Sequence, residues 1–220
     1  MRWEVSVTRR LVAFLVTVLF VGPILAQTPD TPPPGSDTAN HEWSFSLATS
    51  GYIIPDDQSY ASPTFSADHK WLHLEARYNY ENLETASLWA GYNFSFGDRL
   101  VLDVTPMVGA VFGNINGIAP GFNFALSYKR IELSSQGEFV IDPGDSTRNF
   151  FYSWNELSYS LTDWLRAGLA SQRTRVYQTP LDVQRGFLVG FNYKKVDFTT
   201  YVFNAGWTDP TVVLSLGIKF

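Results

Sequence analysis

The chain of 220 residues contains no cysteine, which excludes disulfide bridges, thiolate metal sites and a lipid-modified cysteine. Long apolar runs are also missing after residue 26, because no later stretch approaches the roughly 18 consecutive apolar residues of a transmembrane helix. A helical hydrophobic period is absent over any comparable length of residues 43–220. If residues 27–220 enter a membrane, they must therefore do so as β-strands.

The first 26 residues have the pattern of a secretory signal peptide. Arg2, Arg9 and Arg10 precede the apolar run Leu11–Val21, and Ala26 offers a small residue for cleavage. A membrane anchor is the alternative, but a core of about 11 to 15 apolar residues is shorter than the roughly 20 that span a bilayer. We therefore expect an exported protein that is cleaved after Ala26.

The exported part is acidic. Removing residues 1–26 takes away three arginines and one glutamate, so the formal net charge of -5 becomes -7. This balance argues against nucleic acid as a partner. Residues 27–42 are rich in proline and polar residues, which indicates an extended leader with no core to join. Residues 43–220 are then expected to form a single domain.

Polar and apolar residues alternate from Trp43 onwards. In Trp71–Glu81 the odd positions include His73, Glu75 and Arg77, whereas the even positions carry leucine, alanine and tyrosine. A period of two residues predicts a β-strand with one polar and one apolar face. Similar runs occur at 43–54, 59–67, 85–96, 99–112, 117–128, 130–142, 150–161, 164–175, 184–193, 196–203 and 211–220.

Tight connections between these runs alternate with longer ones. The tight connections recur about every 32 residues, as expected of a hairpin repeat, and they are Gly97-Asp98, Lys129-Arg130, Thr162-Asp163 and Lys194-Lys195. Tight turns on one rim and longer loops on the other are typical of bacterial transmembrane barrels, whose short turns face the periplasm. Aromatic residues gather near the tight-turn rim, which predicts a girdle at a membrane interface.

The last ten residues, T-V-V-L-S-L-G-I-K-F, alternate in polarity and end at Phe220. They resemble the closing strand of Gram-negative outer-membrane β-barrel proteins, in which a terminal phenylalanine belongs to the signal read by the barrel assembly machinery. The resemblance implies an assembly role for Phe220, that machinery as a partner, and a place in the cell outer membrane. It names a class of protein but no activity or oligomeric state.

Outer-membrane lipid and lipopolysaccharide are further partners that the resemblance implies. Arg173 and Arg175 fall near the longer-loop rim, where outward guanidiniums could meet lipopolysaccharide phosphates. A merely solvated rim is the alternative interpretation.

The sequence thus predicts an all-β fold, an antiparallel transmembrane β-barrel of twelve strands, with ten as the alternative. Closed bacterial barrels have an even number of strands, so the run at 43–54 needs the run at 59–67 as its partner. Pro63 is the difficulty, because proline cannot donate a hydrogen bond to a β-ladder.

Successive side chains of a strand point to opposite faces, so many polar and ionisable side chains are expected to face the lumen of the barrel. They could form hydrogen bonds and ion pairs with one another across strands. Alternatively, they could line a narrow pore in which surplus carboxylates favour cations. The candidate lumen residues are His73, Glu75, Arg77, Asn79, Asp103, Glu132, Glu138, Glu156 and Arg166.

We therefore expect porin-like passage of small solutes or a structural role in the envelope, with no cofactor, no metal and no enzymatic activity. The alternative is an outer-membrane hydrolase of lipid or peptide that uses His73 with a neighbouring acid. Glu75 lies about 6.6 Å along the strand from His73, too far for contact unless the side chains reach. No G-x-S-x-G motif supplies a nucleophile, so no catalytic residue is assigned. A soluble exported barrel is a third possibility, which predicts an apolar interior.

Overall fold

The computed structural model describes residues 43–54, 58–176, 182–206 and 210–220. The expected signal peptide at 1–26 and the leader at 27–42 lie outside these residues. Within the described ranges, no helix is both long enough and apolar enough to cross a bilayer. The one short helix in these ranges is a 3-10 turn, η1 (Ser146–Arg148).

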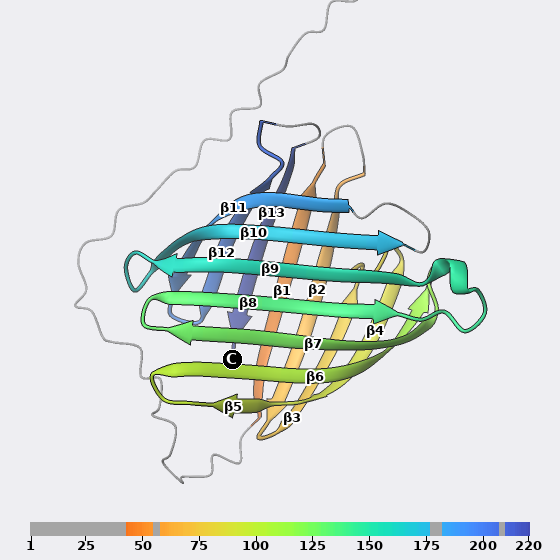
Figure 1. Ribbon diagram of the computed structural model, residues 1–220, viewed down its shortest axis with the longest axis horizontal. Coiled ribbons are helices and arrows are strands. Elements are labelled where there is room, and N and C mark those ends of the chain that lie inside the picture. Colours follow the sequence, from red (N-terminus) through yellow and green to blue (C-terminus); the bar gives the residue numbers. More distant parts are fainter. Residues whose placement is uncertain (1–42, 55–57, 177–181, 207–209) are drawn as a thin grey trace, which may run out of the picture. The chain divides into compact units, whose positions relative to one another are not determined.

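The described strands form one antiparallel sheet (Figure 1). In chain order they are β1 (Ser44–Ile53), β2 (Tyr60–His69), β3 (Leu72–Tyr78), β4 (Thr85–Tyr92), β5 (Phe94–Phe96), β6 (Leu100–Gly113), β7 (Gly117–Tyr128), β8 (Ile131–Val140), β9 (Phe150–Ser160), β10 (Leu165–Val176), β11 (Asp182–Tyr193), β12 (Val196–Phe203) and β13 (Thr211–Lys219).

The sheet closes on itself into a barrel. The first strand, β1, pairs with the last strand, β13, and β4 pairs with β6. Both β4 and β5 pair with β6 in one continuous register, with Gly91 opposite Met107 and Phe94 opposite Val104. They are two halves of one barrel strand, so the closed barrel has twelve strands and the prediction of twelve is confirmed.

Three described prolines lie within strands, and each lies where a ladder is interrupted or ends. Pro120 in β7 pairs with Val108 of β6 but falls just beyond the β7–β8 ladder, which extends to Gly121. The β4–β6 register brings Pro106 opposite Tyr92, at the gap between β4 and β5, where its missing N–H cannot support pairing. A single run over 85–96 was expected, and this proline accounts for its division. Pro63 is in β2 and lies opposite Thr49 of β1. The ladder between β2 and β3 extends only to Thr64, so Pro63 falls just beyond it.

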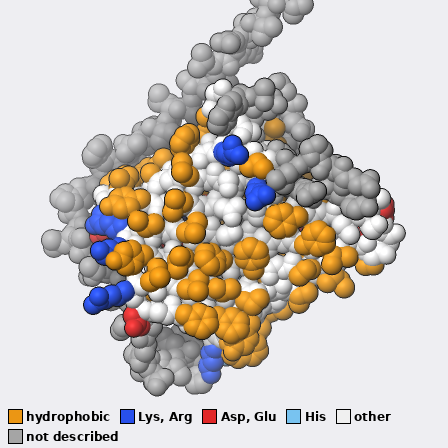
Figure 2. All heavy atoms as spheres, in the orientation of Figure 1, with side chains coloured by type: hydrophobic (Ala, Val, Ile, Leu, Met, Phe, Trp, Pro, Cys, Tyr) orange, Lys and Arg blue, Asp and Glu red, His pale blue; other side chains and the backbone are white. Residues whose placement is uncertain are grey.

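The apolar face of each strand points away from the barrel. Leu88 on β4 is 57% exposed, whereas its neighbour Trp89 is 3% exposed. Large hydrophobic side chains cover the outer face that Figure 2 shows. This arrangement suits lipid contact, and it is opposite to what the soluble-barrel alternative requires.

The interior is less polar than alternation predicts. One buried apolar cluster contains residues of β4, β6, β7, β8 and β9, namely Trp89, Met107, Val111, Ala119, Val140 and Phe150. A second contains residues of β10 to β13, namely Ala170, Leu188, Tyr201, Phe203 and Val213. Packed apolar side chains therefore fill part of the lumen.

The tight-turn rim brings both ends of the barrel wall together. Phe45 and Phe220 exchange two backbone hydrogen bonds, with N–O distances of 3.1 and 2.9 Å. Their rings stack with centroids 6.1 Å apart. Further aromatic contacts near this rim include Trp71 with Tyr92, 5.2 Å between centroids, and Trp164 with Phe191, 6.2 Å. The expected aromatic girdle is therefore continuous with the seam that closes the barrel.

We predict that Gly109→Ala destabilises the barrel by about 1–3 kcal/mol through overpacking. A Cβ at Gly109 would lie 2.4 Å from the buried Trp89 ring, whereas a Cβ at Gly51 would meet nothing closer than 3.8 Å. Denaturant unfolding of refolded protein checks this, with Gly51→Ala as the control. Equal stability of the two variants would contradict the packing account.

Candidate functional site

A buried arginine joins two separate parts of the barrel wall through the lumen. Arg77 projects inward from β3, with 6% of its surface exposed. Its Nε donates to Glu75 Oε2 at 2.6 Å, and its Nη1 donates to Glu138 Oε2 on β8 at 2.9 Å. The alternation of β3 and β8 turns all three side chains inward, so the ion pairs form inside the barrel.

The Arg77 guanidinium also lies between two aromatic rings. Its Cζ is 4.4 Å from the Tyr80 ring centroid and 4.5 Å from that of Trp89, both within cation–π range. Tyr80 belongs to the connector after β3, and its hydroxyl donates to Gln136 Oε1 at 2.6 Å. Glu81 of the same connector accepts hydrogen bonds from Ser87 Oγ and Trp89 Nε1. This connector therefore contributes side chains that narrow the lumen.

His73 is held by two carboxylates. Its Nδ1 lies 2.7 Å from Asp68 Oδ1, and its Nε2 lies 2.8 Å from Glu75 Oε1. Direct contact between His73 and Glu75 was not expected from their separation along the strand. The two side chains nevertheless reach each other. Asn123 on β7 also donates to Glu75, at 3.1 Å. Since both ring nitrogens have carboxylate partners, neither is free to take a proton from a nucleophile.

A second polar cluster lies on the β9, β10 and β12 side of the lumen. Arg166 donates to Glu156 Oε2 at 3.2 Å and to Thr199 Oγ1 at 2.8 Å, and it lies 3.6 Å from Asp197 Oδ1. Glu156 Oε1 also accepts from the indole of Trp154 at 2.8 Å and from a tyrosine hydroxyl, that of Tyr201, at 2.7 Å. These partners fix the Glu156 carboxylate in the wall.

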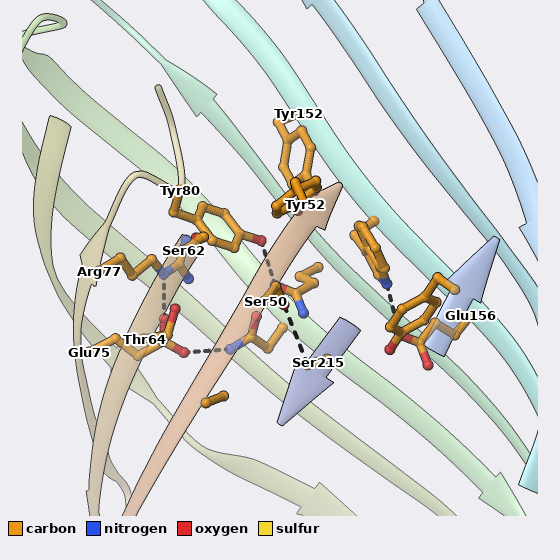
Figure 3. A pocket seen from close by; sticks show the side chains of 15 residues that line it. Ser50, Tyr52, Ser62, Thr64, Glu75, Arg77, Tyr80, Tyr152, Glu156 and Ser215 are labelled. Carbon is orange, nitrogen blue, oxygen red and sulfur yellow. Dashed lines mark hydrogen bonds and ion pairs between the residues drawn. The ribbon is translucent and has the colours of Figure 1, made fainter. Parts of the chain in front are cut away.

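A cavity of about 190 Å³ separates the two polar clusters (Figure 3). Glu75 and Arg77 line one side, and Glu156 lines the other. Hydroxyl groups complete the wall, from Ser50, Tyr52, Ser62, Thr64, Tyr80, Tyr152, Tyr201 and Ser215. Polar groups face the cavity from several strands between the ring faces of Trp154 and the tyrosines, so the cavity suits water and small hydrated solutes.

Carboxylates outnumber cations at both clusters. Asp68, Glu75 and Glu138 accompany His73 and Arg77 in the first, and Glu156 and Asp197 accompany Arg166 in the second. Two carboxylate oxygens, Glu81 Oε2 and Glu138 Oε1, are buried with no hydrogen-bond partner among the described residues. Rings of surplus carboxylate favour cations over anions.

Three of the candidate lumen residues lie apart from these clusters. Asp103 and Glu132 are exposed near the tight-turn rim, where Glu132 accepts from Ser127 at 3.3 Å. Asn79 has a φ of 54°, and its side chain donates to the Ala61 carbonyl of β2 and accepts from the Glu84 amide of the connector. The other six, His73, Glu75, Arg77, Glu138, Glu156 and Arg166, belong to the two clusters.

The apolar face of the predicted strand Trp71–Glu81 includes Tyr80 and was expected to face lipid, and for Tyr80 that expectation is wrong. Alternation predicted that the strand continues past Tyr80, but β3 ends at Tyr78. The left-handed backbone at Asn79 then turns the chain, so Tyr80 enters the lumen. Asparagine tolerates this conformation better than most residues, and it was the one local signal for the turn.

Neither a protein-family model nor a curated protein sequence matches the chain significantly. Among solved structures, the fold is similar to that of the KdgM porin, with a TM-score of 0.56, 10% identity, and coverage of 80% of this chain and 99% of that chain. The NanC porin gives a TM-score of 0.56 and 9% identity over 79% of this chain and 100% of that chain.

A KdgM porin in complex with disordered oligogalacturonate gives a TM-score of 0.54 and 9% identity over 80% of this chain and 98% of that chain. The shared architecture spans almost the whole length of each of these three porins. The chain therefore has the β-barrel fold of these porins.

We predict that Arg77→Met lowers the free energy of unfolding by about 3–5 kcal/mol, because it leaves Glu75 and Glu138 buried without their cation. Adding Glu138→Gln should restore part of the loss, since the two residues are coupled. Denaturant unfolding of the single and double variants measures this.

The matched control is Arg148→Met, which removes an exposed ion pair with Asp145 at 3.6 Å and should change stability little. If Arg77→Met were as stable as this control, the Arg77 ion pairs would not contribute to barrel stability.

Proposed function

We propose that this barrel is a narrow passive channel for small solutes, with a preference for cations. The observation that carries the proposal is the polar cavity between two clusters, each of which has more carboxylates than cations. A barrel of porin-like fold supplies the route across the membrane. A structural role in the envelope is the remaining possibility, and it requires no ion flow.

The size of the solute follows from the narrowness of the lumen. Arg77 and Glu138 form an ion pair inside it, and Tyr80 packs edge-on against Tyr152 with centroids 5.6 Å apart. A cavity of about 190 Å³ has room for several waters but not for a large ligand. Small hydrated cations and small neutral solutes fit these limits.

Acidic oligosaccharides fit this lumen poorly. One similar structure is a KdgM porin in complex with disordered oligogalacturonate, a chain of sugars that each carry a carboxylate. In this barrel such a polyanion would meet Glu75 and Glu156 on opposite sides of the cavity. Like-charge repulsion in a partly desolvated site disfavours that ligand, so we propose a different solute class for this chain.

We propose no hydrolase activity. A histidine base needs a free ring nitrogen facing a nucleophile, and both nitrogens of His73 contact carboxylates. The similar solved structures are porins rather than enzymes.

Two further proposals concern export. We propose that residues 1–26 are removed on secretion, which the mass of the mature protein tests. We also propose that the barrel assembly machinery reads the closing strand through Phe220. Its position at the seam beside Phe45 supports this, and a reduced outer-membrane yield of Phe220→Ala tests it.

The expected selectivity is for cations, measured as a reversal potential in asymmetric KCl across a planar bilayer that contains refolded protein. Asp197→Asn should weaken the preference, because it removes one carboxylate from the second cluster and leaves the Arg166–Glu156 pair intact. The control is Asp98→Asn, which removes an exposed carboxylate in a tight turn outside the lumen.

An anion preference of the unaltered protein would overturn the proposal. An equal shift for Asp197→Asn and Asp98→Asn would also contradict it, since it would assign the selectivity to general surface charge.

A further inference from the structure

A row of polar side chains crosses the outer wall of the barrel on β8 to β11. The register aligns Ser135, Asn155, Ser171 and Arg185 on neighbouring strands, all with outward parity. Ser135 Oγ donates to Asn155 Oδ1 at 2.7 Å, and Asn155 Nδ2 donates to Ser171 Oγ at 3.4 Å. Hydrogen bonds thus join three strands on a face where lipid contact favours apolar residues.

Two unpaired arginines border this row. Arg173 and Arg185 are both exposed, and neither guanidinium has a hydrogen-bond or ion-pair partner among the residues that the structure describes. Arg185 lies opposite Ser171, and Arg173 is two residues further along β10. Figure 2 shows Lys and Arg side chains over β10 and β11 within a largely hydrophobic face. Two positive charges therefore lie within the largely hydrophobic wall, apart from the Lys and Arg side chains at the tight-turn rim.

An apolar groove lies directly beside the polar row. It measures about 620 Å³, and Leu157, Leu169 and Phe187 form its apolar lining. Asn155, Ser171 and Arg185 line the same groove. Glu156 also lines it, but both of its carboxylate oxygens accept hydrogen bonds from lumen residues, namely Trp154, Arg166 and Tyr201. A single ligand seated there would meet hydrocarbon along one part and a cation with hydroxyl and amide groups at the other.

Both arginines lie toward the longer-loop rim, which faces the outside of the cell in such barrels. Arg185 is the fourth residue of β11, which begins next to a longer loop, and Arg173 is the ninth of β10, which begins next to a tight turn. A rise of about 3.3 Å per residue with a tilt of about 45° puts Arg173 roughly 19 Å above the tight-turn end. Long guanidinium side chains at that depth reach the outer headgroup region.

We propose that this groove binds a phosphate-bearing glycolipid of the outer leaflet, that is, the lipid A part of lipopolysaccharide. Its phosphate accepts hydrogen bonds from Arg173 and Arg185, and an acyl chain lies along Leu157, Leu169 and Phe187. Guanidinium groups bind phosphate through paired, charge-assisted hydrogen bonds. A second copy of the barrel is a poorer occupant, because a two-fold interface would bring the same arginines together.

The test compares lipid retention by the full-length exported barrel, refolded in detergent and analysed by native mass spectrometry. The probes are lipopolysaccharide, enzymatically dephosphorylated lipopolysaccharide and phosphatidylglycerol. The variant is Arg173→Gln with Arg185→Gln. The control is Arg99→Gln with Lys195→Gln, which removes two exposed cations near the opposite rim.

We expect lipopolysaccharide to bind the unaltered protein and the control equally, and the Arg173/Arg185 variant at least about tenfold more weakly, as loss of charge-assisted hydrogen bonds implies. Dephosphorylation should weaken binding similarly, and phosphatidylglycerol should not compete.

Equal binding by the variant and the control would overturn the proposal, and so would equal retention of phosphatidylglycerol. A dimer that dissociates in the Arg173/Arg185 variant would also overturn it, by identifying a second copy as the occupant. Ion selectivity should be unchanged in this variant, so the outcome is independent of the proposed channel function.

Discussion

The arrangement of the lumen depends on the ion pairs of one buried residue, Arg77. A buried guanidinium is tolerated only when carboxylates and hydrogen bonds replace its hydration, and Glu75 and Glu138 supply them from β3 and β8. The same guanidinium lies beside the Tyr80 ring, so the connector after β3 is held inside the barrel. The position of the connector, the width of the lumen and the cavity beside it follow from this one buried charge.

The two faces of the wall solve different solvation problems. Outside, lipid requires apolar side chains and a closed ladder, and the seam between β1 and β13 provides the closure. Inside, polar groups must bind one another or water, and the Arg77 and Arg166 clusters do so around a small cavity. Apolar clusters around Trp89 and Phe203 fill the remaining interior. The result is a barrel with a restricted lumen and not a wide aqueous pore.

Alternation was sufficient to predict the barrel and the outward direction of the apolar faces, because a period of two residues is a local property of the sequence. The count of twelve strands also required the even strand number of closed bacterial barrels, since Pro63 weakened the run at 59–67. Alternation also brought His73, Glu75 and Arg77 onto one inward row. It could not predict that Tyr80 enters the lumen, since this depends on the left-handed backbone at Asn79. The pairing of Arg77 with Glu138, 61 residues away, depends on barrel closure and is not visible in any local pattern.

The central claim is that the cavity between the Arg77 and Arg166 clusters belongs to a conducting path that Tyr80 narrows. Single-channel recording of the refolded protein beside Tyr80→Ala tests it most directly. The account predicts small, steady currents for the unaltered barrel and larger ones for Tyr80→Ala, because the variant removes the ring that contacts Tyr152 and Gln136 inside the lumen. The absence of current through both proteins would contradict it and would favour a structural role for the barrel.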